Sequence, residues 1–211
     1  MCKDAKGGKS RMRCLICGKR KEESDSFYDF MNEKDPLCYS CRKKWIRNKE
    51  KRIIDKKLVD TTWLYNEAYA SSLLQYKECY DEALQEIFLF PIKNYLKRKY
   101  HNRTLVLVPS SQKKLEERGF NHLEKMYQCL GMEMMNPFLK LSEDEQKEKS
   151  QKEREEITHL IQLKEGTVIP KRILVVDDVI TTGSTLKACL RLLPKDCDIK
   201  IYVNSTVLKE G

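Results

Sequence analysis

The segment with the clearest chemical meaning runs from Arg172 to Leu186 and reads RILVVDDVITTGSTL. Two adjacent carboxylates, Asp177 and Asp178, follow an apolar run that suits a strand buried on both faces of a parallel sheet. A hydroxyl-rich loop follows the carboxylates, and a helix is expected after it. Backbone N–H groups at a helix start bind phosphate, so the loop is predicted to hold a phosphate group. Carboxylates beside a phosphate need a different partner, and we expect them to face ribose hydroxyls or magnesium in a solvent-filled cleft.

The predicted phosphate loop consists of Thr181, Thr182, Gly183, Ser184 and Thr185. Gly183 lets the backbone turn tightly or approach a ligand closely. A second interpretation stays open, in which the segment is only a buried strand capped by Asp and Thr residues. A P-loop of the GxxxxGK[ST] type is excluded because the chain contains no such pattern.

Two cysteine pairs lie near the start of the chain: Cys14-x-x-Cys17 and Cys38-x-x-Cys41, with twenty residues between the pairs. Four thiolates in this spacing favour one tetrahedral, structural zinc ion. Disulfides are disfavoured because no signal peptide is visible and the lysine-rich composition indicates a reducing compartment. The remaining cysteines are isolated and are expected to be ordinary thiols: Cys2, Cys79, Cys129, Cys189 and Cys197.

Positive charge is concentrated in the first part of the chain. Residues 1–60 hold 18 basic and 10 acidic side chains, whereas the other 151 residues hold 23 and 22. The stretch RKKWIRNKEKRIIDKK mixes bases with apolar residues, which suits phosphate contacts and base stacking. Its candidate contacts to single-stranded DNA are Arg42, Lys43, Lys44, Trp45 and Arg47. Equally open is a solvated helix whose Trp45 packs against the neighbouring domain.

The rest of the chain alternates apolar runs with helical patterns, which predicts a parallel α/β sheet. Strands are expected at 62–66, 104–109, 173–176 and 198–208, and helices within 68–96 and 112–130, the latter interrupted near Gly119. Residues 142–156 have almost no apolar side chain and are expected to form a surface loop or lid. We therefore divide the chain into a basic zinc module with linker, residues 1–60, and an α/β domain, residues 61–211.

Several motifs add a family resemblance. The acidic pair and its loop resemble the phosphoribosyl-pyrophosphate (PRPP) motif of type I phosphoribosyltransferases. The whole chain resembles the ComF family of late-competence proteins, through motifs that occur in this order: Tyr76-Lys77 followed by Asp81; Val108-Pro109-Ser110-Ser111; Glu117-Arg118-Gly119-Phe120-Asn121; Gln146, Ser150, Glu153 and Arg154; and the PRPP motif.

The resemblance implies a type I phosphoribosyltransferase-like sheet flanked by helices, with a small zinc module. It implies that Asp177 and Asp178 meet the ribose hydroxyls while the phosphate loop holds the 5-phosphate. Ser110 and Ser111 would form the pyrophosphate loop, and Lys77 and Arg118 would be catalytic cations near pyrophosphate. Magnesium would accompany PRPP, and the zinc would be structural.

The resemblance also implies a function in natural transformation. We expect a protein that binds single-stranded DNA, bridges a ComFA-like helicase and a DprA-like recombination mediator, and retains a PRPP site. The alternatives are an active phosphoribosyltransferase with an unidentified acceptor, and a zinc-stabilised interaction module. Thr181 stands where 6-oxopurine-recognising relatives carry an Asp, so no familiar acceptor is indicated. The apolar runs are too short to span a bilayer, and a cytoplasmic protein is expected, held near the inner membrane face through uptake partners.

Overall fold

A computed structural model describes residues 12–21, 26–140 and 161–208. At its centre is a six-stranded sheet with the strand order β1-β2-β8-β7-β3-β4. Only the β1–β2 pair is antiparallel, and the other four pairs are parallel. The predicted α/β class with a mostly parallel sheet is therefore confirmed. The strands are β1 Arg52–Ile54, β2 Lys57–Leu64, β3 Thr104–Leu107, β4 Met134–Met135, β7 Arg172–Ile180 and β8 Asp198–Thr206.

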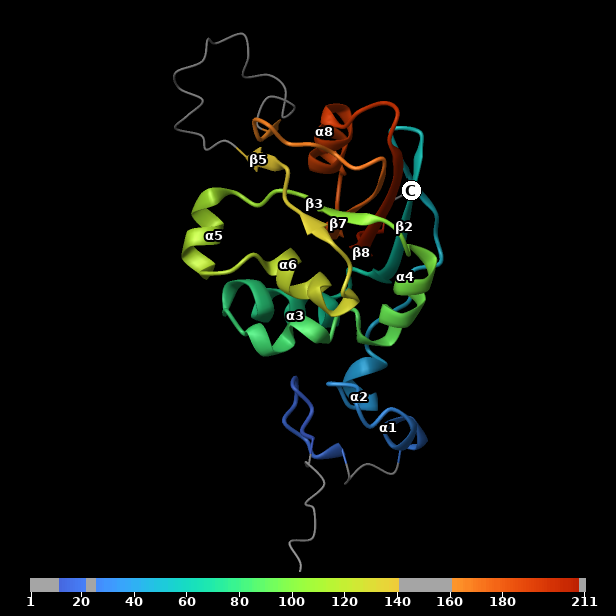
Figure 1. The fold of residues 1–211 in the computed structure, drawn as a ribbon. Coiled ribbons are helices and arrows are strands. Elements are labelled where there is room, and N and C mark those ends of the chain that lie inside the picture. The colour runs from blue at the N-terminus through green and yellow to red at the C-terminus, as the bar shows by residue number, and fades with distance from the viewer. Residues whose placement is uncertain (1–11, 22–25, 141–160, 209–211) are drawn as a thin grey trace, which may run out of the picture.

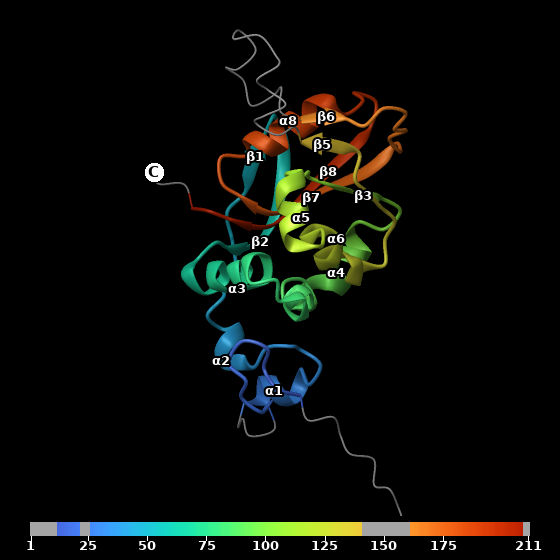
Figure 2. The ribbon, with the colours of Figure 1, turned by 90° about the vertical axis from the view of Figure 1, so that its left-hand side faces the viewer.

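Helices cover both faces of this sheet (Figures 1 and 2). On one face lie α3, α4 and α6, and on the other lie α8 and a small two-stranded antiparallel sheet, β5–β6. The bounds are α3 Glu67–Glu78, α4 Lys93–Lys99, α5 Gln112–Arg118, α6 His122–Tyr127, α8 Ser184–Leu192, β5 Phe138–Lys140 and β6 Ile161–Leu163; short 3-10 helices span Glu82–Glu86, Phe90–Ile92 and Gln128–Leu130.

The central strands are apolar because helices shield them on both sides. All of Thr104–Leu107 is buried, and so are the four residues before Asp177. The helical stretch predicted at 112–130 breaks at Gly119, as expected from the sequence, because Gly119 adopts a left-handed φ of 73° that ends α5. The core thus fixes β7 and β3, whose carboxyl ends carry the candidate site.

The cysteine module contains α1 Phe27–Met31 and α2 Tyr39–Arg42 and lies beyond the α3 side of the sheet (Figure 1). One apolar cluster runs without interruption from Leu37 and Cys38 through Trp45 to Trp63 of β2. The division predicted at residue 60 falls inside β2, and the sheet already begins at Arg52. Two strands of the sheet therefore come from the segment that the sequence assigned to the zinc module.

The predicted lid at 142–156, with the motif residues Gln146, Ser150, Glu153 and Arg154, lies outside the described residues. Within the described part of the chain, no helix combines the length and the apolar character needed to cross a bilayer.

Candidate functional site

The carboxyl ends of β3 and β7 border a cavity between α3, α5 and α6. Both predicted carboxylates line it, although they lie within β7 rather than after it. Most of the residues predicted to bind PRPP meet here. The lining includes Lys77, Ser110, Ser111, Arg118, Asp177, Asp178 and Thr185, together with Lys114, His122 and Lys140.

Asp178 is held by two groups from the helical layer. Its Oδ2 lies 2.5 Å from Lys77 Nζ and 3.2 Å from His122 Nε2. Burial favours the neutral acid, but Lys77 and His122 outweigh burial and hold the pKa of Asp178 well below its usual range. Asp178 is only 5% exposed. The expectation of two solvent-facing carboxylates is therefore wrong for Asp178, which is an ion-paired, buried carboxylate.

Asp177 behaves in the opposite way. Burial, and then the negative charge of Asp178 beside it, raise the pKa of Asp177 well above its usual range. The ligand-free pair consequently favours one proton, on Asp177, and one negative charge, on Asp178. Such a pair can donate one hydrogen bond and accept several, which suits the two adjacent hydroxyls of a ribose.

Arg118 and His122 extend this network. Arg118 Nη2 donates to Glu78 Oε1 at 2.7 Å, and its Nη1 lies 3.3 Å from His122 Nδ1. Burial lowers the pKa of His122 although Asp178 opposes the shift, so the imidazole is neutral near pH 7. An Arg donor facing Nδ1 places the imidazole proton on Nε2, which faces Asp178. Both predicted cations are thus paired with carboxylates in the ligand-free site.

The predicted phosphate loop closes onto the start of α8. Gly183 has a φ of 81°, and Thr182 Oγ1 lies 2.9 Å from Ser184 Oγ. Thr185 reaches the cavity directly, and the rest of the loop precedes it in the chain. A Cβ atom on Gly183 would lie 2.7 Å from Ile54 Cδ1, the movable end of that side chain, so the left-handed backbone angle is the main reason for glycine at this position.

The β1 strand supports the phosphate loop from outside. Arg52 Nη1 donates to the carbonyl of Ile180 at 3.2 Å and to Thr206 Oγ1 at 2.8 Å, while its Nη2 donates to the carbonyl of Thr181. The guanidinium thus ties the end of β7 to the end of β8. Sequence reasoning missed this role because Arg52 stood within a basic stretch interpreted as a DNA contact.

His122 was missed as well, although a signal was present. It directly follows the Arg118–Asn121 motif, and Asn121 caps α6 by accepting from the backbone N–H groups of Leu123 and Glu124. This cap starts the helix at His122 and turns the imidazole toward Asp178. Lys114 and Lys140 also line the cavity, and nothing in their sequence context distinguished them from surface lysines.

The four cysteines of the two pairs come together as predicted. The sulfur atoms of Cys14, Cys17, Cys38 and Cys41 all lie within 4.8 Å of one another, and the Cys17–Cys38 separation is 3.8 Å. A tetrahedral ion with ~2.3 Å metal–sulfur bonds needs sulfur atoms about 3.8 Å apart, so the set fits zinc. All four are free thiols. Burial disfavours the thiolate of Cys14, yet backbone N–H groups of Cys17, Cys38 and Ile16 lower its pKa to about 7.

The candidate DNA contacts are only partly exposed. Trp45 is 5% exposed and packs against Trp63, Tyr69 and Phe88, with ring centroids 4.8–5.6 Å away. The structure therefore contradicts base stacking by Trp45 and favours the packing alternative.

Arg42 is buried too. Its Nη2 donates to Asp35 Oδ1 at 2.6 Å, and its Nη1 donates to the carbonyl of Ile87 at 2.9 Å. Direct DNA contact by Arg42 is contradicted because the guanidinium is enclosed and paired. Lys43, Lys44 and Arg47 are exposed, so the predicted DNA-binding set is reduced to these three.

Comparison with known proteins agrees with this geometry. Residues 119–205 match the phosphoribosyl transferase domain family. Competence protein ComFC of Streptococcus pneumoniae (strain ATCC BAA-255 / R6) is 28% identical over 206 residues, which cover 86% of this chain and 93% of the relative. Competence protein ComFC of Bacillus subtilis (strain 168) is 25% identical over 223 residues, covering 92% and 93%.

The chain is ComFC-like. The similarity extends over most of both proteins, and the four-cysteine cluster is consistent with it. The ComFC-like chain therefore combines a phosphoribosyltransferase-like domain with a cluster that could bind a metal ion such as zinc.

Proposed function

We propose that this ComFC-like chain acts in natural transformation, where it binds incoming single-stranded DNA and retains a PRPP-binding site. A ComFA-like helicase and a DprA-like recombination mediator are its proposed partners. The competence role is supported by the names and coverage of the two relatives. The PRPP site is supported by one observation above others: Asp177, Asp178 and Thr185 share a cavity with the serines after β3 and two cations.

In this proposal PRPP binding rearranges the ion pairs of the site. The 5-phosphate lies at the phosphate loop, and the two carboxylates accept hydrogen bonds from the ribose hydroxyls. The Lys77 ammonium then leaves Asp178 and binds a pyrophosphate oxygen. Arg118 binds the pyrophosphate as well, together with Ser110 and Ser111. Magnesium bound with PRPP supplies further positive charge at the pyrophosphate.

An active phosphoribosyltransferase is the second candidate function. The opposed pKa shifts of Asp177 and Asp178 favour it, because active sites typically split the pKa values of neighbouring acids. The acceptor is unassigned, since Thr181 offers no carboxylate that would read a nucleobase.

Calorimetric titration of PRPP, with and without magnesium, tests the site. We expect binding to the wild-type chain and loss of binding in the Asp177→Ala/Asp178→Ala variant. A control that removes two exposed carboxylates away from the cavity, Glu165→Ala/Asp196→Ala, should bind normally. Unchanged PRPP affinity in the first variant would refute the site assignment. Release of pyrophosphate, followed by phosphorus NMR, separates the transferase from the binding protein.

A single-stranded DNA titration tests the competence role separately. Fluorescence anisotropy of a labelled dT15 oligonucleotide should show binding that weakens steeply with salt. Absence of any binding at low salt would refute direct DNA handling while leaving the PRPP site in place.

A further inference from the structure

A second cavity lies at the opposite end of the sheet strands. It occupies about 410 Å³ between the C-terminal end of α4 and the first residues of β2, β7 and β8. Arg172, the first residue of β7, lines this cavity, whereas Asp177 of the same strand lines the PRPP candidate site. Five residues of extended strand separate them by about 16 Å, so the two cavities are distinct.

The second cavity is strongly basic. Its lining includes Lys57, Lys99, Arg103, Arg172 and Lys200 but only one acidic residue, Asp60. The α4 segment contributes to this charge, because residues 93–103 hold five basic side chains and no acidic one. The near-neutral balance of residues 61–211 therefore conceals a local positive surface.

Two of these cations are held in short ion pairs, Arg172 makes only a long one, and the other two make none within the described part of the chain. Lys99 Nζ lies 2.7 Å from Asp60 Oδ2, which also accepts from the Tyr100 hydroxyl, and Arg103 Nη2 lies 2.5 Å from Asp198 Oδ2. These pairs neutralise both carboxylates near the cavity. Among the described residues, Lys57 and Lys200 make no ion pair, and Arg172 reaches Asp198 only at 4.0 Å.

The cations available to bind a phosphate are thus Lys57, Arg172 and Lys200.

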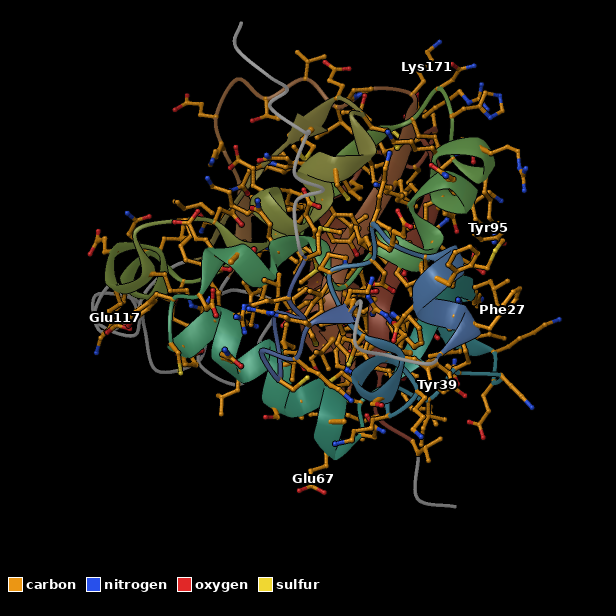
Figure 3. All side chains as sticks on the ribbon, turned by 90° about the horizontal axis from the view of Figure 1, so that it is seen from below. Phe27, Tyr39, Glu67, Tyr95, Glu117 and Lys171 are labelled. Atoms are coloured by element: carbon orange, nitrogen blue, oxygen red, sulfur yellow. The ribbon has the colours of Figure 1, made fainter. Side chains whose placement is uncertain are left out.

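Apolar and aromatic groups complete the surface. Leu58 lines the cavity and is 50% exposed, although it stands on a strand of the central sheet. Tyr95 is 51% exposed one turn before Lys99, whose Nζ lies 5.5 Å from its ring centroid. In Figure 3 Tyr95 projects outward beside α4. Exposed apolar surface at Leu58, in the same lining as Lys57 and Lys200, suits a planar ring that carries phosphate, and Tyr95 lies outside the lining.

We propose that this cavity binds a nucleotide, with its phosphate at Lys57, Arg172 and Lys200 and its ring against Leu58. The nucleotide is either free or a unit of single-stranded DNA. In the second case the inference rests on the proposed function and moves part of the DNA contact from the cysteine module to the α/β domain.

The test compares two triple variants of the full chain. The first, Lys57→Ala/Arg172→Ala/Lys200→Ala, removes the three lining cations that are not held in a short ion pair. The control, Lys113→Ala/Lys164→Ala/Arg191→Ala, removes the same charge from exposed positions that do not line it. Both are titrated with dTMP, with inorganic phosphate and with dT15, and thermal unfolding checks that each variant is folded.

We expect the cavity variant to lose at least about tenfold in affinity for the nucleotide ligand, and the control to lose much less. If dT15 is the ligand, the slope of the salt dependence should also fall by about 0.7, the value for one lost phosphate contact on a single strand. An effect on dTMP assigns the site to free nucleotides, and an effect on dT15 alone assigns it to the single strand.

Three results would overturn the inference. The first is equal binding by both variants while the wild type binds dT15, which would leave the proposed DNA function standing. The second is no binding of dTMP or dT15 by the wild type. The third is inorganic phosphate binding as tightly as dTMP, which would remove the role of the ring. As a second check on the ring, the neutral substitution Leu58→Ser should weaken binding of the same ligand without changing thermal stability.

Discussion

Replacing Trp45 by Ala distinguishes the two interpretations of the basic, aromatic stretch, which are base stacking and core packing. In the structure Trp45 is a core residue, so the variant should lose stability without losing DNA affinity. Its ring lies 5.4 Å from Trp63, 4.8 Å from Tyr69 and 5.6 Å from Phe88, and the Arg42 guanidinium carbon lies 4.8 Å from it. Removing it leaves a cavity at the junction between the cysteine module and the sheet.

The expected cost follows from these contacts. A buried Trp truncated to Ala typically costs about 3–5 kcal/mol of unfolding free energy. The aromatic pairs, each worth about 0.5–1.5 kcal/mol beyond their buried area, place Trp45 in the upper part of that range. For a chain of this size each kcal/mol lowers the thermal midpoint by about 2–4 °C. We therefore expect a decrease of roughly 8–20 °C.

The assay measures thermal unfolding and dT15 affinity on the same samples, the latter well below the lowered midpoint. The matched variant Lys43→Ala/Lys44→Ala changes two exposed charges, and it should weaken dT15 binding with little change in stability. A Trp45→Ala protein with an unchanged thermal midpoint and weakened DNA binding would refute the structural reasoning and restore the stacking role.

Three further predictions concern the metal, the carboxylates and the phosphate loop. Cys38→Ser should abolish binding of one zinc per chain and lower the midpoint of a single unfolding transition, because the cysteine module shares the core of the sheet. Metal analysis and calorimetry measure the two effects. A separate transition for the module, with an unchanged main midpoint, would contradict this prediction. Asp178→Asn should cost about 3–5 kcal/mol near pH 7. The cost should begin to shrink as the pH falls below about 4, the unfolded-state pKa, and should be lost only when the pH passes through the much lower folded-state pKa of Asp178. Asp177→Asn should instead stabilise the protein increasingly as the pH rises above about 4, because the raised folded-state pKa makes ionised Asp177 unfavourable. Urea unfolding at several pH values measures the unfolding free energy of both variants. A change of the same sign in the two variants would refute the assignment. Thr185→Ala should weaken PRPP binding about tenfold at unchanged thermal stability, measured by calorimetry.

The sequence correctly predicted those elements whose structure depends on residues adjacent in the chain. The apolar run before Asp177, the glycine at the start of α8 and the break at Gly119 each follow from backbone and burial preferences of adjacent residues. The two CxxC pairs likewise carry their ligand geometry within short knuckles. For these features the sequence-based prediction agrees with the structure closely.

Features that depend on distant partners were not predictable in this way. Lys77 meets Asp178 across 101 residues of chain, and Arg52 meets Ile180 across 128. A basic residue that pairs with a distant carboxylate or carbonyl has the same local pattern as a solvated one. Arg42 and Trp45 were misassigned for this reason, because only the folded core shows that they are enclosed.

The support that Arg52 gives to the phosphate loop determines where the chain can be cut. A fragment starting at residue 61 would lack β1, half of β2 and the guanidinium that joins Ile180 to Thr206. It would also expose Trp63 and Phe88, which Trp45 covers. Loss of ligand binding by such a fragment would therefore report a damaged sheet edge rather than the location of a binding surface. Point substitutions in the intact chain are the sound way to assign roles to the amino-terminal segment.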